Sequence, residues 1–116
     1  MMSIESLHQP VMLQEALEAL HLKPGHTIVD ATVGTAGHSL EILKAISPGG
    51  RLIGIDRDED SLVIAKERLD EFNSQVDASD RITIDIAHGD FRDINKILSA
   101  LKVKKIDGIL FDLGVS

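Results

Sequence analysis

The stretch HTIVDATVGTAGHS, residues 26 to 39, joins a short β-branched run to the start of a helical pattern. Its first half predicts a buried strand that ends near Asp30, and Gly34 and Gly37 then lead into a helix. A glycine loop between a strand and a helix usually binds phosphate, because the helix N-terminus presents unpaired N–H groups. Asp30 is a carboxylate that would repel phosphate, so this loop favours another ligand.

The same alternation of strand and helix continues along the chain. Predicted helices cover residues 10–22, 37–46, 58–72 and 91–103, and predicted strands lie within residues 26–32, 51–58, 81–90 and 105–116. Asp58 is the expected N-cap of the third helix. The apolar stripe of that helix consists of Leu62, Ala65, Leu69 and Phe72. Strands separated by helices form a parallel sheet with right-handed crossovers and helices on both faces, so the fold class is α/β and Rossmann-like.

The fourth predicted strand is also the end of the sequence. In a doubly wound sheet such a strand normally leads into another loop and helix, and a strand left at an edge exposes unpaired backbone groups. We therefore expect residues 1–116 to be the N-terminal part of a truncated domain, with the first four strands only.

Composition excludes several classes of protein. The 116 residues are 43% hydrophobic and 27% charged, which is typical of one globular domain. There are no cysteines, and the five histidines lack metal-ligand spacing, so we predict neither disulfides nor a metal site. The start of the chain lacks the features of a signal peptide, and no apolar run has the length of a membrane span. We therefore expect a cytoplasmic protein without membrane contacts.

Charge restricts the partners. The formal net charge is -7, which argues against strong nucleic-acid binding by this chain alone, because Lys and Arg contacts supply most non-specific affinity. The only basic cluster, KVKK at residues 102–105, is interpreted as a solvated turn before a strand. With three Phe and no Trp or Tyr, no base-stacking platform is visible. A nucleic-acid substrate would need help from outside this chain.

Acidic residues close or follow every predicted strand: Asp30 the first, Asp56 the second, Asp90 the third and Asp112 the fourth. Parallel strands end at one edge of a sheet, and ligands of such sheets bind there. Asp56 follows the loop by about 20 residues, the spacing at which an acid reaches ribose hydroxyls in nucleotide-binding βαβ units. Asp30 and Asp112 favour a cationic group, and Phe91 is placed to cover one face of an adenine.

A ribose, an adenine and positive charge without phosphate describe S-adenosylmethionine, which we predict as the cofactor. NAD is the main competitor, but the loop is G-x-x-G and lacks the dinucleotide pattern G-x-G-x-x-G. Structural roles stay open for the same residues: a tight turn for Gly34 and Gly37, helix caps for Asp56 and Asp90, core for Phe91, and an ordinary first helical turn for His38.

Four segments carry a family resemblance: HQPVML at residues 8–13, VDATVGTAGHS at 29–39, LIGIDRD at 52–58 and KIDGILFDLGVS at 105–116. Together they resemble the ribosomal RNA small-subunit methyltransferase H family, of the MraW type. The resemblance implies a class I S-adenosylmethionine-dependent methyltransferase that methylates N4 of a cytidine in the decoding region of 16S ribosomal RNA. It also implies an inserted helical domain that helps bind RNA, which residues 1–116 do not include.

Carried over by position, the resemblance implies cofactor contacts at Ala36, Gly37, His38, Asp56, Phe91 and Asp112. Asp112 is also our hypothesis for a catalytic residue, acting on the methyl end or on the amine. The family loop often has glycine and an aromatic residue where this chain has Ala36 and Val33, and Ala36 still offers a backbone N–H. The expected partner is small-subunit ribosomal RNA, contacted mostly by regions outside the chain. Two other hypotheses stay open: a non-catalytic S-adenosylmethionine-binding module and an NAD-binding Rossmann domain.

Overall fold

The computed structural model describes residues 18–31 and 37–110. These residues include the strands β1 (Thr27–Asp30), β2 (Arg51–Asp56), β3 (Thr83–His88) and β4 (Gly108–Leu110). They also include the helices α2 (Gly37–Ile46), α3 (Glu59–Ser74) and α4 (Ile94–Ala100) and the 3₁₀ turns η1 (Ala78–Asp80) and η2 (Phe91–Asp93). The strand order is β3-β2-β1-β4 and all neighbours are parallel, which confirms the predicted α/β sheet.

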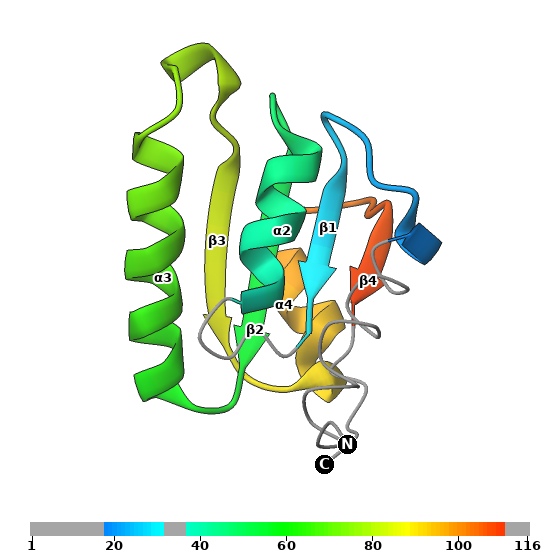
Figure 1. Ribbon diagram of the computed structural model, residues 1–116. Coiled ribbons are helices and arrows are strands. Elements are labelled where there is room, and N and C mark those ends of the chain that lie inside the picture. The colour runs from blue at the N-terminus through cyan, green and yellow to red at the C-terminus, as the bar shows by residue number, and fades with distance from the viewer. Residues whose placement is uncertain (1–17, 32–36, 111–116) are drawn as a thin grey trace, which may run out of the picture.

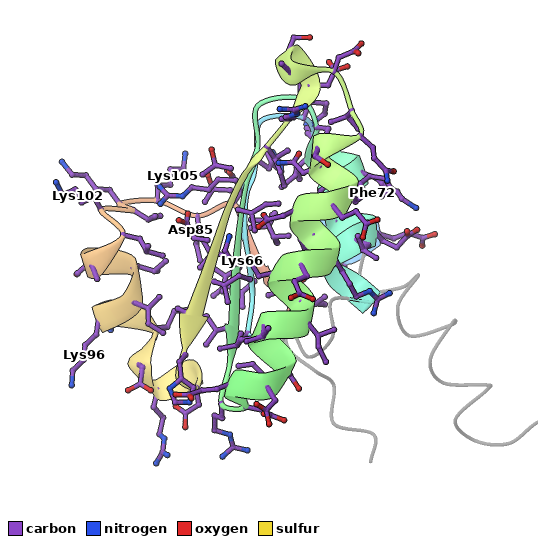
Figure 2. All side chains as sticks on the ribbon, turned by 90° about the vertical axis from the view of Figure 1, so that its left-hand side faces the viewer. Lys66, Phe72, Asp85, Lys96, Lys102 and Lys105 are labelled. Carbon is purple, nitrogen blue, oxygen red and sulfur yellow. The ribbon has the colours of Figure 1, made fainter. Side chains whose placement is uncertain are left out.

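The sheet is the middle of three layers. Helices α2 and α3 lie in front of it and α4 lies behind it (Figure 1), and the view from the side shows the layers edge-on (Figure 2). Ile28 and Leu52 pack toward α2 and α3, whereas Val29 and Ile53 pack toward α4. Because successive strand residues point to opposite faces, β1 and β2 are buried on both sides, as central parallel strands require.

Helix α3 follows its predicted pattern. Leu62, Ala65 and Leu69 are buried, and Phe72 packs against the same core. Asp58 is the N-cap, and its Oδ1 accepts the N–H groups of Asp60 at 2.9 Å and of Ser61 at 3.4 Å. The cap satisfies donors that have no partner within the helix.

Polar side chains fix the connections between the layers. Asn73, near the end of α3, donates from Nδ2 to the carbonyl of Ile82 at 2.9 Å and accepts the N–H of Ile82 at 3.1 Å. On the opposite face, Arg51 donates from Nε to Asp85 at 2.7 Å and from Nη2 to the carbonyl of Leu101 at 3.2 Å. The first pair sets the start of β3, and the second ties β2 and β3 to the end of α4.

Strand β4 is attached to β1 by a reciprocal pair of bonds. Asp107 accepts the N–H of Thr27 at 2.8 Å, and its own N–H donates to the carbonyl of Thr27 at 2.7 Å. Of the helix predicted over residues 10–22, residues 18–20 are described and are helical. In the part of the chain that the structure describes, no helix is long and apolar enough to cross a membrane.

Candidate functional site

The carboxyl ends of the strands meet at one edge of the sheet, at the bottom of Figure 1. The register pairs Asp30 with Gly54, so β2 continues two residues past the end of β1, to Asp56. Asp56 is paired in turn with His88, the last residue of β3. At the usual rise per residue, the end of β2 projects about 7 Å beyond the end of β1. The edge therefore forms a step, with Asp30 at its base and Asp56 at its rim.

Asp30 is buried at the base of this step, with 1% of its surface exposed. Its Oδ2 accepts a hydrogen bond from the hydroxyl of Ser39 at 2.6 Å, and Ser39 is also fully buried. Ser39 lies in the first turn of α2, so this bond joins the two ends of the segment between β1 and α2. A buried carboxylate requires such bonds. No role was predicted for Ser39, although the sequence places its hydroxyl in the first turn of the predicted helix.

Asp56 stands at the rim and organises the turn that follows it. Its Oδ1 accepts the N–H of Asp58 at 2.9 Å, which is the geometry of an Asx turn. Its carbonyl accepts the N–H of Gly89 at 2.9 Å, so the pairing of β2 with β3 extends past the strands. The capping of α3 belongs to Asp58, as the sequence predicted, and Asp56 is not the cap of that helix.

His88 holds the same turn from the neighbouring strand. Its Nε2 lies 2.8 Å from the carbonyl oxygen of Arg57, and because a carbonyl only accepts, Nε2 is the donor. Its Nδ1 lies 3.4 Å from Oε1 of Glu59. The turn around Asp56 is thus fixed by its own side chain, by the backbone of β3 and by an imidazole. A structural or surface role was predicted for His88, but its partner could not be, because that backbone carbonyl is brought close only by the sheet register.

Asp90 has the capping role that the sequence left open. Its Oδ1 accepts the N–H of Arg92 at 2.8 Å, at the start of η2, and its Oδ2 lies 3.1 Å from Nη2 of Arg92. The side-chain hydrogen bond from Arg92 lowers the pKa of Asp90, so the carboxylate keeps its charge. The helix predicted from residue 91 therefore begins as a 3₁₀ turn and becomes α4 at Ile94.

The predicted cofactor-binding residues fall into three groups. Asp30 and Asp56 are described in full at the carboxyl edge. Gly37 and His38 are the first residues of α2 and Phe91 is the first of η2, although the side chains of His38 and Phe91 lie outside the described part. Gly34, Ala36 and Asp112 lie outside the described residues, so their roles, including the catalytic role of Asp112, stay predictions. Within residues 18–31 and 37–110, no three or more His, Asp or Glu side chains are grouped to hold a metal ion.

Solved structures share this architecture. Protein-L-isoaspartate O-methyltransferase matches with a TM-score of 0.68 and 16% identity, over 92% of this chain and 30% of that chain. TrmN from Thermus thermophilus matches with a TM-score of 0.68 and 22% identity, over 88% of this chain and 27% of that chain. With the strand order, these matches show that the fold is Rossmann-like, as in class I methyltransferases.

The chain belongs to the MraW methylase family, which matches residues 5–116. It is 43% identical over 113 residues to the ribosomal RNA small subunit methyltransferase H of Lachnospira eligens, covering 97% of this chain and 33% of the relative. It is 45% identical over 116 residues to the protein of the same name from Dictyoglomus turgidum, covering 100% of this chain and 37% of the relative. The predicted family is confirmed, and the chain spans about a third of the length of these relatives.

Proposed function

We propose that this chain is the cofactor-binding part of an S-adenosylmethionine-dependent methyltransferase that methylates N4 of a cytidine in the decoding region of 16S ribosomal RNA. The observation that carries the proposal is the position of Asp56, held at the rim of the carboxyl edge in a chain of the MraW family. We assign residues 1–116 to the N-terminal part of the methyltransferase domain. In this proposal the remaining strands and the helical RNA-binding insertion lie outside these residues, and the protein acts in the cytoplasm.

The residues of the edge suit S-adenosylmethionine better than a dinucleotide. The two neighbouring hydroxyls of a ribose donate hydrogen bonds, and an ionised carboxylate such as that of Asp56 accepts such bonds strongly. The negative charge of Asp30 at the base of the step favours the cationic end of S-adenosylmethionine. The same charge would repel the pyrophosphate of NAD. Asp56 would bind the ribose of either ligand, so the preference for S-adenosylmethionine rests on the charge of Asp30 and on the family.

Bound S-adenosylmethionine supplies a methyl group activated by the positive sulfur. Methyl transfer is an in-line displacement, so the contribution of the protein is to orient the reacting groups. Asp56 fixes the ribose end in this proposal, and the bond between Asp30 and Ser39 fixes where α2 begins relative to β1. Asp112 is the proposed residue at the methyl end, where it would affect the acceptor amine.

Calorimetry tests the role of Asp56 by measuring how tightly the full-length protein binds S-adenosylmethionine. We expect Asp56→Asn to raise the dissociation constant about 10- to 100-fold, because one or two charge-assisted hydrogen bonds weaken. Asp60→Asn is the matched control, since Asp60 is an exposed acid on the first turn of α3 and its loss changes the net charge equally. Equal affinities of the two variants would contradict the assignment.

The reaction itself is tested by incubating the protein with small ribosomal subunits and labelled S-adenosylmethionine. The expected product is N4-methylated cytidine in the 16S RNA. Binding of the cofactor without methyl transfer would favour the non-catalytic binding module. Tighter binding of NAD than of S-adenosylmethionine would favour the dinucleotide domain and overturn the proposal.

A further inference from the structure

Four lysines lie on helix α4 and on the segment that follows it. Lys96 lies on α4, and Lys102, Lys104 and Lys105 lie on the segment that leads from α4 to β4. We call these four residues the lysine surface; all of them are exposed. Residues 94–106 contain these four lysines and no Asp or Glu, in a chain whose net charge is -7. The charge of this segment is therefore opposite to that of the whole chain.

Among the described residues, the lysine surface lacks the ion pairs that Lys44 and Lys66 make, as does the exposed Lys23. On α2 and α3, Lys44 pairs with Glu41 and Lys66 pairs with Asp70, each at 2.9 Å. Among the described residues, no ammonium group of the lysine surface has an acidic or carbonyl partner within bonding distance. These four charges are accordingly available to an external anion.

Asp85 is an acid on this side of the sheet, and Asp107 is an exposed acid two residues after Lys105. Figure 2 shows Asp85, Lys96, Lys102 and Lys105 on the α4 side of the molecule, opposite the helix that carries Lys66. The carboxylate of Asp85 is occupied by Arg51, at 2.7 Å. Asp85 is therefore paired with Arg51, and the carboxylate of Asp107 accepts the backbone N–H of Thr27 at 2.8 Å, so neither acid is paired with a lysine of this surface.

The backbone of Lys102 gives an independent reason to look for a function. Helix α4 ends with a bond from the Lys102 N–H to the Ser99 carbonyl at 3.0 Å and one from the Val103 N–H to the Leu98 carbonyl at 2.8 Å. This is a Schellman ending, in which the residue at the position of Lys102 is usually glycine. Lys102 has a φ of 59°, where a Cβ is unfavourable. A side chain kept at such a position often serves a function.

We propose that the lysine surface binds the phosphate backbone of ribosomal RNA, at a distance from the reacting base. This inference rests on the proposed function and adds a second contact for its substrate. Lys102, Lys104 and Lys105 lie at the amino edge of the sheet, and Asp56 lies at the carboxyl edge. The six residues of β2 span about 20 Å between these edges. Contacts at that distance position a large RNA without reading its sequence.

An RNA backbone suits this surface better than a membrane does. Lipid binding by a basic surface requires apolar side chains that enter the bilayer beside the lysines. The large hydrophobic residues that are exposed in the described part of the chain are Val63 and Ile64, and both lie on α3. Helix α3 covers the other face of the sheet. The lysine surface offers charge without an apolar anchor, as phosphate contacts require.

The test compares two double variants of equal charge. Lys102→Gln/Lys105→Gln removes half of the lysine surface, and Lys44→Gln/Lys66→Gln removes two paired lysines from the other face. The probe is 16S ribosomal RNA transcribed in vitro, titrated at several salt concentrations. We expect the slope of log affinity against log salt to fall by about 1.4 to 1.8 in the first variant, because each phosphate contact contributes about 0.7 to 0.9. We expect a fall of less than half that in the control. Equal slopes in the two variants would overturn the proposal.

Lys102→Gly separates function from stability. Glycine relieves the left-handed backbone position, so the melting temperature should rise by a few degrees while the affinity for the RNA falls. A higher melting temperature with unchanged RNA affinity and salt slope would show that lysine is merely tolerated there, and would overturn the proposal.

Two further measurements keep this inference distinct from the proposed function. Affinity for S-adenosylmethionine should stay within about twofold in all these variants, since the surface is remote from Asp56. If the parent protein does not bind the cofactor but the salt slopes are as expected, the proposed enzymatic function is contradicted and the RNA contact is still supported. Binding to vesicles of phosphatidylglycerol and phosphatidylcholine that depends on Lys102 and Lys105, without an effect on RNA, would instead assign the surface to membranes and overturn the inference.

Discussion

At the scale of single residues, the bond between Asp30 and Ser39 has the clearest energetic consequence. Ser39→Ala removes one hydrogen bond from a buried carboxylate, so we expect the free energy of unfolding to fall by about 1–3 kcal/mol. Urea denaturation followed by circular dichroism measures this change. Ser99→Ala is the control, because Ser99 is an exposed serine on α4, and its effect should stay within about 0.5 kcal/mol. Equal stabilities of the two variants would contradict the role of Ser39.

His88 acts at the same scale, as a positioning residue for the turn around Asp56. We expect His88→Ala to raise the KM for S-adenosylmethionine about 2- to 10-fold with little change in kcat, because a neutral hydrogen bond contributes about 0.5–1.5 kcal/mol. His88→Gln, whose amide also donates, should recover part of the loss. A lower kcat at unchanged KM would show that His88 does not act through the cofactor site.

These two interactions also show where prediction from sequence ends at this scale. Acids at strand ends could be recognised, because a parallel sheet brings its carboxyl ends together whatever its detailed register. The partners of those acids could not. His88 reaches the carbonyl of Arg57 only because β2 and β3 end level with each other, and an apolar pattern does not encode that register. Lys102 was interpreted as part of a solvated turn, and nothing in its residue type indicates a left-handed backbone.

At the scale of elements, Asn73 links the end of α3 to the start of β3. Asn73→Ala removes both bonds to Ile82 and leaves a partly buried N–H and carbonyl without a protein partner. We expect the free energy of unfolding to fall by about 1–3 kcal/mol, measured by urea denaturation. The exposed Asn95 on α4 provides the control variant Asn95→Ala, which should differ from the parent by less than about 0.5 kcal/mol.

Element boundaries could be predicted well where one periodicity dominates. Helix α2 spans residues 37–46 as expected, because its apolar residues recur at helical spacing between two glycine-containing breaks. The third strand is shorter than its pattern indicated, since Ile82 bonds the side chain of Asn73 and the strand starts at Thr83. The start of α4 was also misplaced, because Asp93 accepts the N–H of Asp90 and Asp90 accepts the N–H of Arg92, which favours a 3₁₀ turn before the helix. In both cases a local side chain competes with the regular backbone pattern.

At the scale of the whole molecule, the fold separates two kinds of charge. The carboxyl edge carries Asp30, Asp56 and Asp90, whereas the lysine surface lies on the α4 side and reaches the opposite edge. The net charge of -7 led us to expect no strong nucleic-acid binding by this chain alone, which stays a prediction, and a net value contains no information about where charges gather. Alternation of strands and helices was enough to predict the layers. The strand order β3-β2-β1-β4 was not predicted, because alternation does not encode which strands become neighbours.

The central position of β1 in the sheet should protect this strand from local unfolding. Both neighbours of β1 are hydrogen-bonded to it, and both of its faces are buried. We expect the amides of Ile28 and Val29 to exchange with deuterium only on global unfolding, and those of the three-residue edge strand β4 to exchange sooner. Exchange measured by NMR checks this order, and faster exchange in β1 than in β4 would contradict it. Asp30 stands on the strand whose protection we expect to be lost last, so the base of the proposed cofactor site should persist for as long as the sheet remains folded.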